Sequence, residues 1–253
     1  TEGLPQNASQ EQKWTKTIRA RLDAWIANTV VPALEKRISE LGLSATVGAD
    51  GPTVRVACEA LSAGTGYLSP VGLLEFGARS TGEPSEPKDV VCDAAAYLPE
   101  VAFPTARPAT MRPERTFWEK STAIHVFCQG GKLRGDERVS RHWYDIAALD
   151  RVGYADKAIA DRNLAHLVAR HKNIFFREKD DHGGQVNYVD AASGGLTLVP
   201  TGARLEHLAG DYRRMVGDGL IFVAPPAFEA LIEQCTGLQE RANAAGRSRG
   251  PRL

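Results

Sequence analysis

The segment between Arg112 and Val152 constrains the fold most, because it predicts two helices that present opposite charges to each other. A first run, RPERTFWEKSTAIHVF, is followed by the polar loop QGGKLRGDE and then by RVSRHWYDIAALDRV. Lys120 shares one predicted helix face with Phe117 and Ile124, at spacings of three and four residues. A lysine is therefore expected in the middle of an apolar stripe instead of on the solvent side.

The second of these predicted helices carries Asp145, one turn before Leu149. A lysine and an aspartate presented by neighbouring helices suit the binding and transfer of a phosphate-bearing group. The spacing leaves a second interpretation open. In that case Lys120 extends past its apolar neighbours into water and pairs with an ordinary surface aspartate.

Composition excludes some classes of protein and leaves a globular protein as the expectation. The 253 residues are 43% hydrophobic and 25% charged, which is ordinary for a globular chain. The net charge is zero, so no global field favours nucleic acid or a membrane, and no apolar run approaches the roughly 20 residues that span a bilayer. Four scattered cysteines without CxxC spacing argue against zinc and fit a cytoplasmic location.

Apolar periodicity predicts a long helix at the start of the chain, over residues 11–43, which Pro32 should kink or divide. Alternating apolar residues then predict strands on both sides of a GADGPT turn and beyond it. The expected strands cover residues 45–47, 53–60, 71–80, 89–98 and 101–103. Further helices are expected over residues 157–171, 203–216 and 225–244, with a loop over 175–195.

This order of a helix, several strands and then helices predicts an α+β protein. The expected division is a sheet domain with a long N-terminal helix over residues 1–110, a helical domain over 111–245 and a disordered tail over 246–253. The predicted strand VGLLEFGARS carries one carboxylate, Glu75, with Arg79 four residues later. A charge within an apolar strand points either into water or into a site, and the pattern leaves both open.

Five segments, LLEFGARSTGEP, RTFWEKSTAIHVF, RHWYDIAAL, DYRRM and PPAFEALI, resemble in this order the AbiEii/AbiGii toxin family of nucleotidyltransferases. The resemblance extends from about Trp14 to Asn243. It implies a polymerase-β-like nucleotidyltransferase, in which a small mixed sheet with carboxylates precedes a helical domain. Such proteins are the toxins of toxin–antitoxin and abortive-infection systems. Some relatives transfer nucleotides from an NTP to the 3′ end of tRNA, and others bind GTP.

The resemblance also implies roles for individual residues. Glu75 corresponds to the carboxylate of the family's second motif, Lys120 to the lysine of the third and Asp145 to the aspartate of the fourth. Nucleotidyl transfer needs carboxylates that hold Mg²⁺, or Mn²⁺, against the NTP phosphates, and cations that offset the developing charge. We therefore expect Glu75 at the metal and Lys120 at the triphosphate, with Asp145 orienting the nucleotide or the lysine. Arg79 and Arg115 are candidates for further phosphate contacts.

Basic residues in the loop between the two central helices, and at the start of the second helix, are candidates for contacts with an RNA backbone. They are Lys132, Arg134, Arg138 and Arg141. A solvated, charged loop is the alternative interpretation of the same residues.

One part of the family pattern has no counterpart in this sequence. The first motif, a Gly-Ser or Gly-Gly-Thr turn leading to an Asp-x-Asp pair, does not occur between Thr1 and Arg55. We expect the segment that carries it to be missing from the sequence, which begins without Met and enters a helix almost at once. The expected partners are an NTP, an RNA such as tRNA and a cognate antitoxin, with no membrane.

Two other classes of function were weighed. A catalytically inactive protein of the same fold, which binds a nucleotide, RNA or a partner, is the first alternative. A hydrolase is the second, and it is disfavoured because the six histidines are dispersed and no GxSxG motif is present. Structural or surface roles are the expectation for all six histidines.

Overall fold

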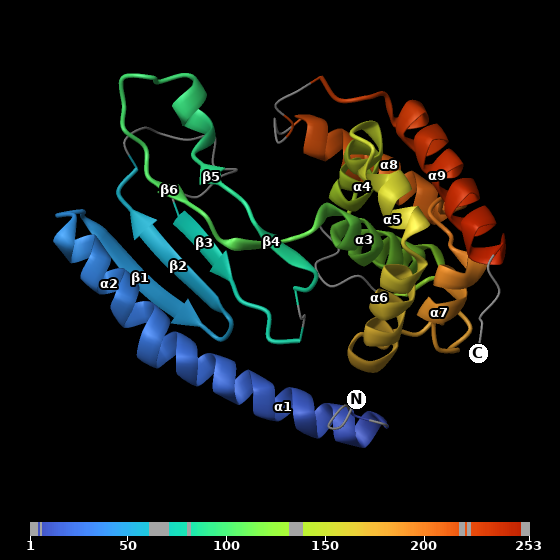
Figure 1. The fold of residues 1–253 in the computed structure, drawn as a ribbon, viewed down its shortest axis with the longest axis horizontal. Coiled ribbons are helices and arrows are strands. Elements are labelled where there is room, and N and C mark those ends of the chain that lie inside the picture. Colours follow the sequence, from blue (N-terminus) through green and yellow to red (C-terminus); the bar gives the residue numbers. More distant parts are fainter. Residues whose placement is uncertain are drawn as a thin grey trace. The chain divides into compact units, whose positions relative to one another are not determined.

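A computed structural model describes residues 5, 7–60, 71–79, 82–131, 139–217, 221 and 224–248 of the chain. The chain forms two compact units, Thr1–Thr81 and Gly82–Leu253 (Figure 1). The division lies between residues 81 and 82 instead of between 110 and 111, because the chain after Gly82 is tied to the helical unit. The backbone N–H of Arg112 donates to Pro84, and the Arg115 side chain donates to the carbonyl of Glu83.

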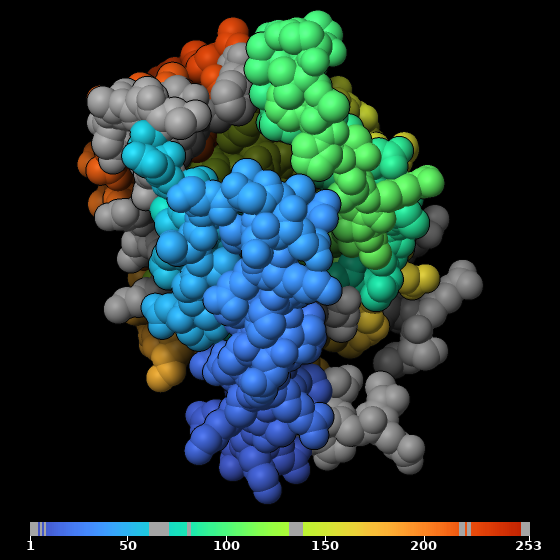
Figure 2. Space-filling view, turned by 90° about the vertical axis from the view of Figure 1, so that its left-hand side faces the viewer, coloured from blue at the N-terminus to red at the C-terminus, as the bar shows by residue number. Residues whose placement is uncertain are grey.

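The first unit opens with two α-helices joined by a π turn, α1 (Ala8–Trp25), η1 (Ile26–Val30) and α2 (Val31–Glu40). The side chain of Asn7 caps α1 by accepting a hydrogen bond from Gln10 N at 2.9 Å. In the π turn the N–H of Val31 donates to the carbonyl of Ile26, five residues earlier. The next residue, Pro32, has no N–H to continue the α-helical ladder, so the expected division takes the form of this π turn. Most side chains of α1 are exposed (Figure 2).

An antiparallel sheet in the order β1–β2–β3 completes the first unit, with β1 (Ala45–Asp50), β2 (Thr53–Cys58) and β3 (Val71–Glu75). The turn between β1 and β2 contains Gly51 at φ 52°, a backbone conformation that favours glycine. Val54 is fully buried on the face of the sheet that it shares with its partner Leu74. The opposite face carries Glu75 at the end of β3, and this side chain is exposed.

Two predicted strands between residues 89 and 103 are corrected by the structure. Only Val90–Val91 (β5) forms a strand there, paired with Thr105–Ala106 (β6), and Asp93–Ala96 is a 3₁₀ helix (η2). Three consecutive alanines provide no branched or aromatic side chains to pack on a sheet, which explains why a strand does not continue. A second short pair, β4 (Ser85–Pro87) with β7 (Ala109–Met111), leads into the helices.

The second unit is helical after Arg112. Its helices are α3 (Pro113–Cys128), α4 (Arg141–Arg151), α5 (Tyr154–Ala160), α6 (Arg162–Phe175), α7 (Tyr188–Asp190), the π turn η3 (Ala191–Gly195), α8 (Ala203–Gly217) and α9 (Phe228–Ser248). The α+β class is therefore confirmed. None of these helices, nor those of the first unit among the described residues, combines the length and the hydropathy that crossing a membrane requires.

Three boundaries in this unit differ from the prediction. The helix expected over residues 157–171 is divided at Asp161, whose side chain accepts a hydrogen bond from Leu164 N at 3.0 Å and so starts a new helix. The expected loop over 175–195 contains α7 and η3. The start of the predicted disordered tail is helical through Ser248, and residues 249–253 lie outside the described part of the chain.

Helix α3 lies against α4, α5 and α6 in the core of this unit (Figure 1). Phe117, Trp118 and Ile124 of α3 are buried. The indole N–H of Trp118 donates to the carbonyl of Ala158 at 2.9 Å, and that of Trp143 donates to Leu198 at 2.7 Å. Both large aromatic residues thus bury their rings and satisfy their polar atom. This packing fixes the orientation of α3.

Two glycines of α9 provide a matched test of how this helix packs on η3. A Cβ on Gly246 would lie 2.5 Å from the backbone nitrogen of Gly194, whereas a Cβ on Gly237 would meet no atom within 4 Å. Gly246→Ala is expected to destabilise the protein by about 1–3 kcal/mol, because backbone must move. Gly237→Ala should stabilise it by up to about 1 kcal/mol, since alanine favours a helix interior. Urea unfolding of both variants measures the difference; equal stabilities would contradict the close contact.

Candidate functional site

Lys120 of α3 and Asp145 of α4 form an ion pair, with 2.6 Å between Lys120 Nζ and Asp145 Oδ2. The two helices pack directly on each other, and Pro113 at the first position of α3 sets where that helix begins. The side chains of Lys120 and Asp145 are 24% and 38% exposed, so solvent reaches both charges. The structure thus places a half-buried cation beside buried Phe117 and Ile124, with a carboxylate facing it.

A second charged group of side chains links α3 with α6. Glu119 accepts from Arg115 at 2.9 Å and from Lys172 at 2.6 Å. The ammonium of Lys172 also lies over the ring of Phe176, 4.5 Å from its centroid. Burial by itself raises the pKa of Glu119, but Lys172 and Arg115 outweigh it, so the pKa of Glu119 is lowered. Glu119 is therefore ionised at neutral pH.

His142 connects the two groups of charges electrostatically. It lies one turn before Asp145 on α4, and burial together with Lys120, Arg141 and Lys172 lowers the pKa of His142 to about 4. The imidazole is therefore neutral at pH 7, and its Nδ1 is buried without a hydrogen-bond partner among the described residues. The two ion-pair groups are carried by one helix, α3, which packs against both α4 and α6.

We call this site the cationic cluster. It consists of Arg115, Glu119, Lys120, His142, Asp145 and Lys172. Three cations and two carboxylates, with His142 neutral, leave one net positive charge in the cluster. A partly buried surplus of positive charge favours an anionic ligand.

The other predicted phosphate and RNA contacts of the helical unit differ in their exposure to solvent. Arg115 is only 1% exposed, because its guanidinium binds Glu119 and the carbonyl of Glu83. The contact of Arg115 with a phosphate stays a prediction, and in the structure this side chain contacts Glu119 and Glu83. Arg141 is exposed at the first position of α4. The remaining predicted RNA contacts, Lys132, Arg134 and Arg138, lie outside the described residues.

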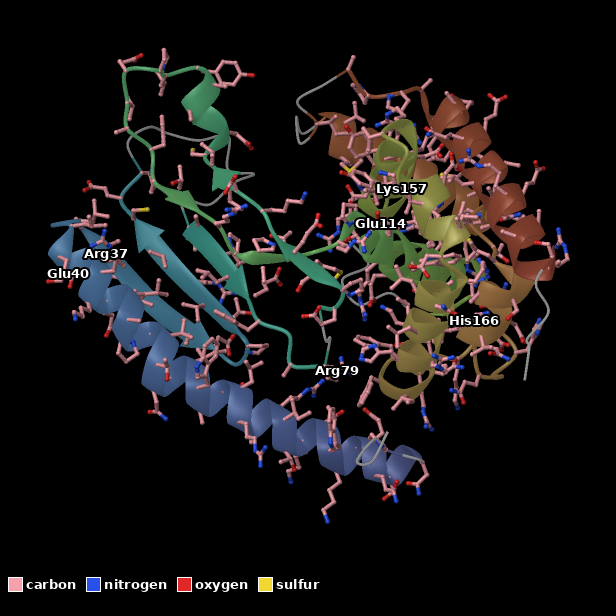
Figure 3. All side chains as sticks on the ribbon, viewed as in Figure 1. Arg37, Glu40, Arg79, Glu114, Lys157 and His166 are labelled. Carbon is pink, nitrogen blue, oxygen red and sulfur yellow. The ribbon has the colours of Figure 1, made fainter. Side chains whose placement is uncertain are left out.

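Glu75 and Arg79 both belong to the first unit. Glu75 ends β3 on the open face of its sheet, directly across from Thr53 of β2, and Arg79 follows it in a half-buried bend (Figure 3). Among the described residues, no three His, Cys, Asp or Glu side chains come together as a metal site. The open face of the sheet carries Glu75 and, two strands away in the same register, the exposed Asp50 of β1. One or two carboxylates fit a cation that takes its other ligands from phosphate and water.

Three members of the cluster were missed by the sequence prediction. Glu119 directly precedes Lys120, but its partner Lys172 lies far along the chain. The helix predicted over residues 157–171 ends one residue before Lys172, so no predicted element contains this lysine. His142 was assigned a structural or surface role. A continued amphipathic pattern through Phe175 is the signal that could have placed Lys172 on a helix.

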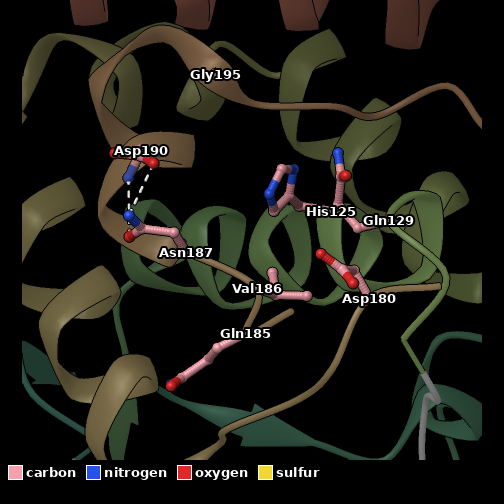
Figure 4. Close-up of a pocket in the computed structure, with 8 residues that line it drawn as sticks. All are labelled: His125, Gln129, Asp180, Gln185, Val186, Asn187, Asp190 and Gly195. Atoms are coloured by element: carbon pink, nitrogen blue, oxygen red, sulfur yellow. Dashed lines mark hydrogen bonds between the residues drawn. The ribbon is translucent and has the colours of Figure 1, made fainter. Parts of the chain in front are cut away.

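A separate pocket of about 230 Å³ lies at the C-terminal end of α3 (Figure 4). Its lining residues are His125, Gln129, Asp180, Gln185, Val186, Asn187, Asp190 and Gly195. Nδ1 of His125 accepts from the backbone N–H of Thr197 at 3.1 Å, and burial lowers the pKa of His125 to about 4. Asn187 donates to Asp190 at 2.7 Å across one wall (Figure 4). No member of the cationic cluster lines this pocket.

Comparison with protein families identifies the family to which the chain belongs. One family model, described as nucleotidyl transferase AbiEii toxin of a type IV toxin–antitoxin system, matches residues 7–234. The chain belongs to the AbiEii family. The match covers most of both units and contains Glu75, the cationic cluster and the α3–α4 pair. No curated protein and no solved structure matches the chain significantly.

Membership in the AbiEii family confirms the resemblance seen in the sequence. The family description makes this chain a toxin of the nucleotidyl transferase type, with an antitoxin as its counterpart in a type IV system. The reaction of the family involves a nucleotide and hence phosphate groups. An anionic ligand of that kind agrees with the positive surplus of the cationic cluster.

Two neutral histidines, the buried His125 and the half-buried His142, predict a loss of stability in acid. The pKa of His125 and that of His142 are each lowered from 6.5 to about 4, so the unfolded chain binds protons in this window and the folded chain does not. The free energy of unfolding should be highest above about pH 6.5. It should fall as the pH is lowered toward 4, by up to about 3 kcal/mol for each histidine.

Urea unfolding measured between pH 7.5 and pH 4.5 tests this loss. His142→Asn should show a shallower decline than the unsubstituted protein, because one of the two proton-binding groups is gone. The same decline in both proteins would show that His142 is not held neutral in the folded state.

Proposed function

We propose that this AbiEii toxin transfers a nucleotide from an NTP to an RNA acceptor, the 3′ end of tRNA. The observation that carries the proposal is the half-exposed Lys120–Asp145 pair within a net-positive cluster, in a chain of the nucleotidyl transferase family. A fixed ammonium is suited to a phosphate ligand, because hydrogen bonds between ionised groups are short and strong.

In the proposed reaction the acceptor hydroxyl attacks the α-phosphorus of the NTP and releases its proton to water. The bond from the α-phosphorus to the bridging oxygen breaks, and pyrophosphate leaves. Lys120 donates to the phosphate oxygens and offsets the charge that gathers on them. Asp145 accepts from Lys120 at 2.6 Å and holds the ammonium in position, which avoids the cost of ordering a free lysine during the reaction.

We propose that Mg²⁺, or Mn²⁺, accompanies the NTP and takes Glu75 as one ligand. The exposed carboxylate at the end of β3 supports this assignment, and Mg²⁺ usually combines one or two carboxylates with substrate phosphates and water. The bound cation would supply positive charge to the phosphates. Arg79, close to Glu75 in the chain, stays a candidate for a phosphate contact.

The RNA acceptor is proposed to meet the exposed Arg141 at the start of α4, together with Lys132, Arg134 and Arg138 of the preceding loop. Arginine and lysine contacts to the phosphate backbone position a nucleic acid without reading its sequence. The cognate antitoxin is the proposed second macromolecular partner. A protein that binds the nucleotide without transferring it is the alternative, and the experiment below separates the two.

The decisive experiment uses the full-length protein with labelled NTPs and total tRNA, and resolves the products on a denaturing gel. The unsubstituted protein should extend the tRNA. Lys120→Ala and Asp145→Ala should each remove extension, and growth inhibition on expression, without unfolding the protein. Lys120→Ala should also weaken NTP binding by about 10- to 100-fold, because a hydrogen bond to a charged group contributes about 1.5–3 kcal/mol.

Lys157→Ala is the matched control. This exposed lysine of α5 lies in the same unit, over the ring of Tyr154, and is no member of the cationic cluster (Figure 3). Its loss should leave extension and NTP affinity unchanged. NTP binding without any extension by the unsubstituted protein would establish the alternative, and full activity of Lys120→Ala would remove this residue from the site.

A further inference from the structure

We infer that Lys172 is a second triphosphate-binding residue of the proposed NTP site, and that Glu119 is the internal counter-ion which occupies Lys172 until the triphosphate binds. This inference rests on the proposed function. Three features of the cationic cluster support it: the distribution of its charges, the exposure of its members and the contacts that hold Lys172.

The charges of the cluster divide into two groups. Lys120 and Asp145 neutralise each other as a pair. Arg115 and Lys172 face one carboxylate, Glu119, so the net positive charge of the cluster resides in this second group. The positive charge of Lys120, the lysine predicted from the sequence, is thus already neutralised by Asp145. The charge available to a polyanion lies on the α3–α6 side.

The solvent exposure of Arg115 and Lys172 determines which of these two side chains can contact a ligand. Arg115 is 1% exposed and donates to both Glu119 and the carbonyl of Glu83, which ties it to the interior. Lys172 is 12% exposed, so part of its side chain is reached by solvent. The excess positive charge of the cluster is therefore accessible to a ligand through Lys172.

Lys172 is held in a fixed position before any ligand arrives. Its ammonium is 2.6 Å from Glu119 Oε2 and lies over the ring of Phe176. A lysine that is already ordered loses little further conformational freedom when it binds. Arg115 keeps Glu119 anchored on the opposite side, so a triphosphate oxygen can share or replace the contact to Lys172 without releasing the carboxylate.

Lys120 and Lys172 come from different helices that are linked through α3. Glu119, the partner of Lys172, directly precedes Lys120 in α3, and this helix packs against both α4 and α6. In the proposed complex, the ammonium groups on α3 and α6 contact one polyanion. A triphosphate carries several negative charges and binds more strongly to two such groups than to one.

A purely structural role is the competing explanation, because an ion pair could simply join α3 and α6. Buried ion pairs contribute little net stability on average, whereas removal of one partner is costly. The two explanations differ for Glu119→Gln. If Glu119 competes with a phosphate for Lys172, this variant binds a polyanion more tightly, but a structural ion pair predicts only a lower stability.

A calorimetric titration with inorganic tripolyphosphate tests the inference, because it measures polyanion binding without requiring nucleotidyl transfer. Lys172→Ala should weaken binding about tenfold or more, and Lys172→Arg should retain most of the affinity because it keeps the charge. Glu119→Gln should strengthen binding severalfold. Lys157→Ala, the exposed control on α5, should bind like the unsubstituted protein.

The double variant Glu119→Gln, Lys172→Ala completes the cycle. The increase in tripolyphosphate affinity caused by Glu119→Gln should disappear when Lys172 is absent, since the carboxylate acts through that lysine. If the double variant bound tripolyphosphate more tightly than Lys172→Ala does, the counter-ion role of Glu119 would be overturned. Tripolyphosphate affinity that is equal in Lys172→Ala and the unsubstituted protein would overturn the whole inference. Unfolding curves of Lys172→Ala show whether its loss of affinity reflects lost charge or lost structure.

The tRNA extension assay separates this inference from the proposed function. Extension by Lys172→Ala with an unchanged KM for the NTP would refute the role of Lys172 and leave nucleotidyl transfer intact. If the unsubstituted protein binds tripolyphosphate through Lys172 but never extends RNA, the polyanion site stands and the proposed transfer to RNA fails.

Discussion

The structure of the helical unit depends on the requirement that a charge removed from water must meet an opposite charge. Helix α3 carries Arg115 and Lys120 among residues that pack in the core, and each of them is compensated by a carboxylate. Glu119 is provided by α3 itself and Asp145 by α4, while Lys172 of α6 completes the set. The ion pairs therefore link three helices, and the most buried of these charges, on Arg115, Glu119 and Lys172, are the ones that most need their partners. The same requirement concentrates the functional groups in one place.

Local patterns were sufficient to predict the central helices. The spacing around Lys120 and the start at Pro113 are properties of a short stretch, so the sequence could indicate α3 and α4 and the facing of Lys120 and Asp145. The ion pair of Glu119 with Lys172 joins residues distant in the chain, and no local pattern encodes such a partner. Short elements were missed for a related reason. The two residues of β5 and the three of α7 depend on packing more than on their own sequence.

The two units differ in how their charged side chains are held. The sheet of the first unit carries the exposed carboxylates Glu75 and Asp50 on one face. The helical unit holds the ammonium groups of Lys120 and Lys172 in ion pairs with carboxylates of its own. The AbiEii family match covers both units, so both belong to the pattern of the family model.

The π turn between α1 and α2 has a consequence for the geometry of the first unit. A turn that closes five residues back contains one residue more than an α-helical turn, so it acts as a one-residue insertion in an otherwise continuous helix. Each residue of an α-helix advances by about 100° around the axis. The residues of α2 are therefore displaced around the axis by about this angle from the positions that an uninterrupted α-helix would give them.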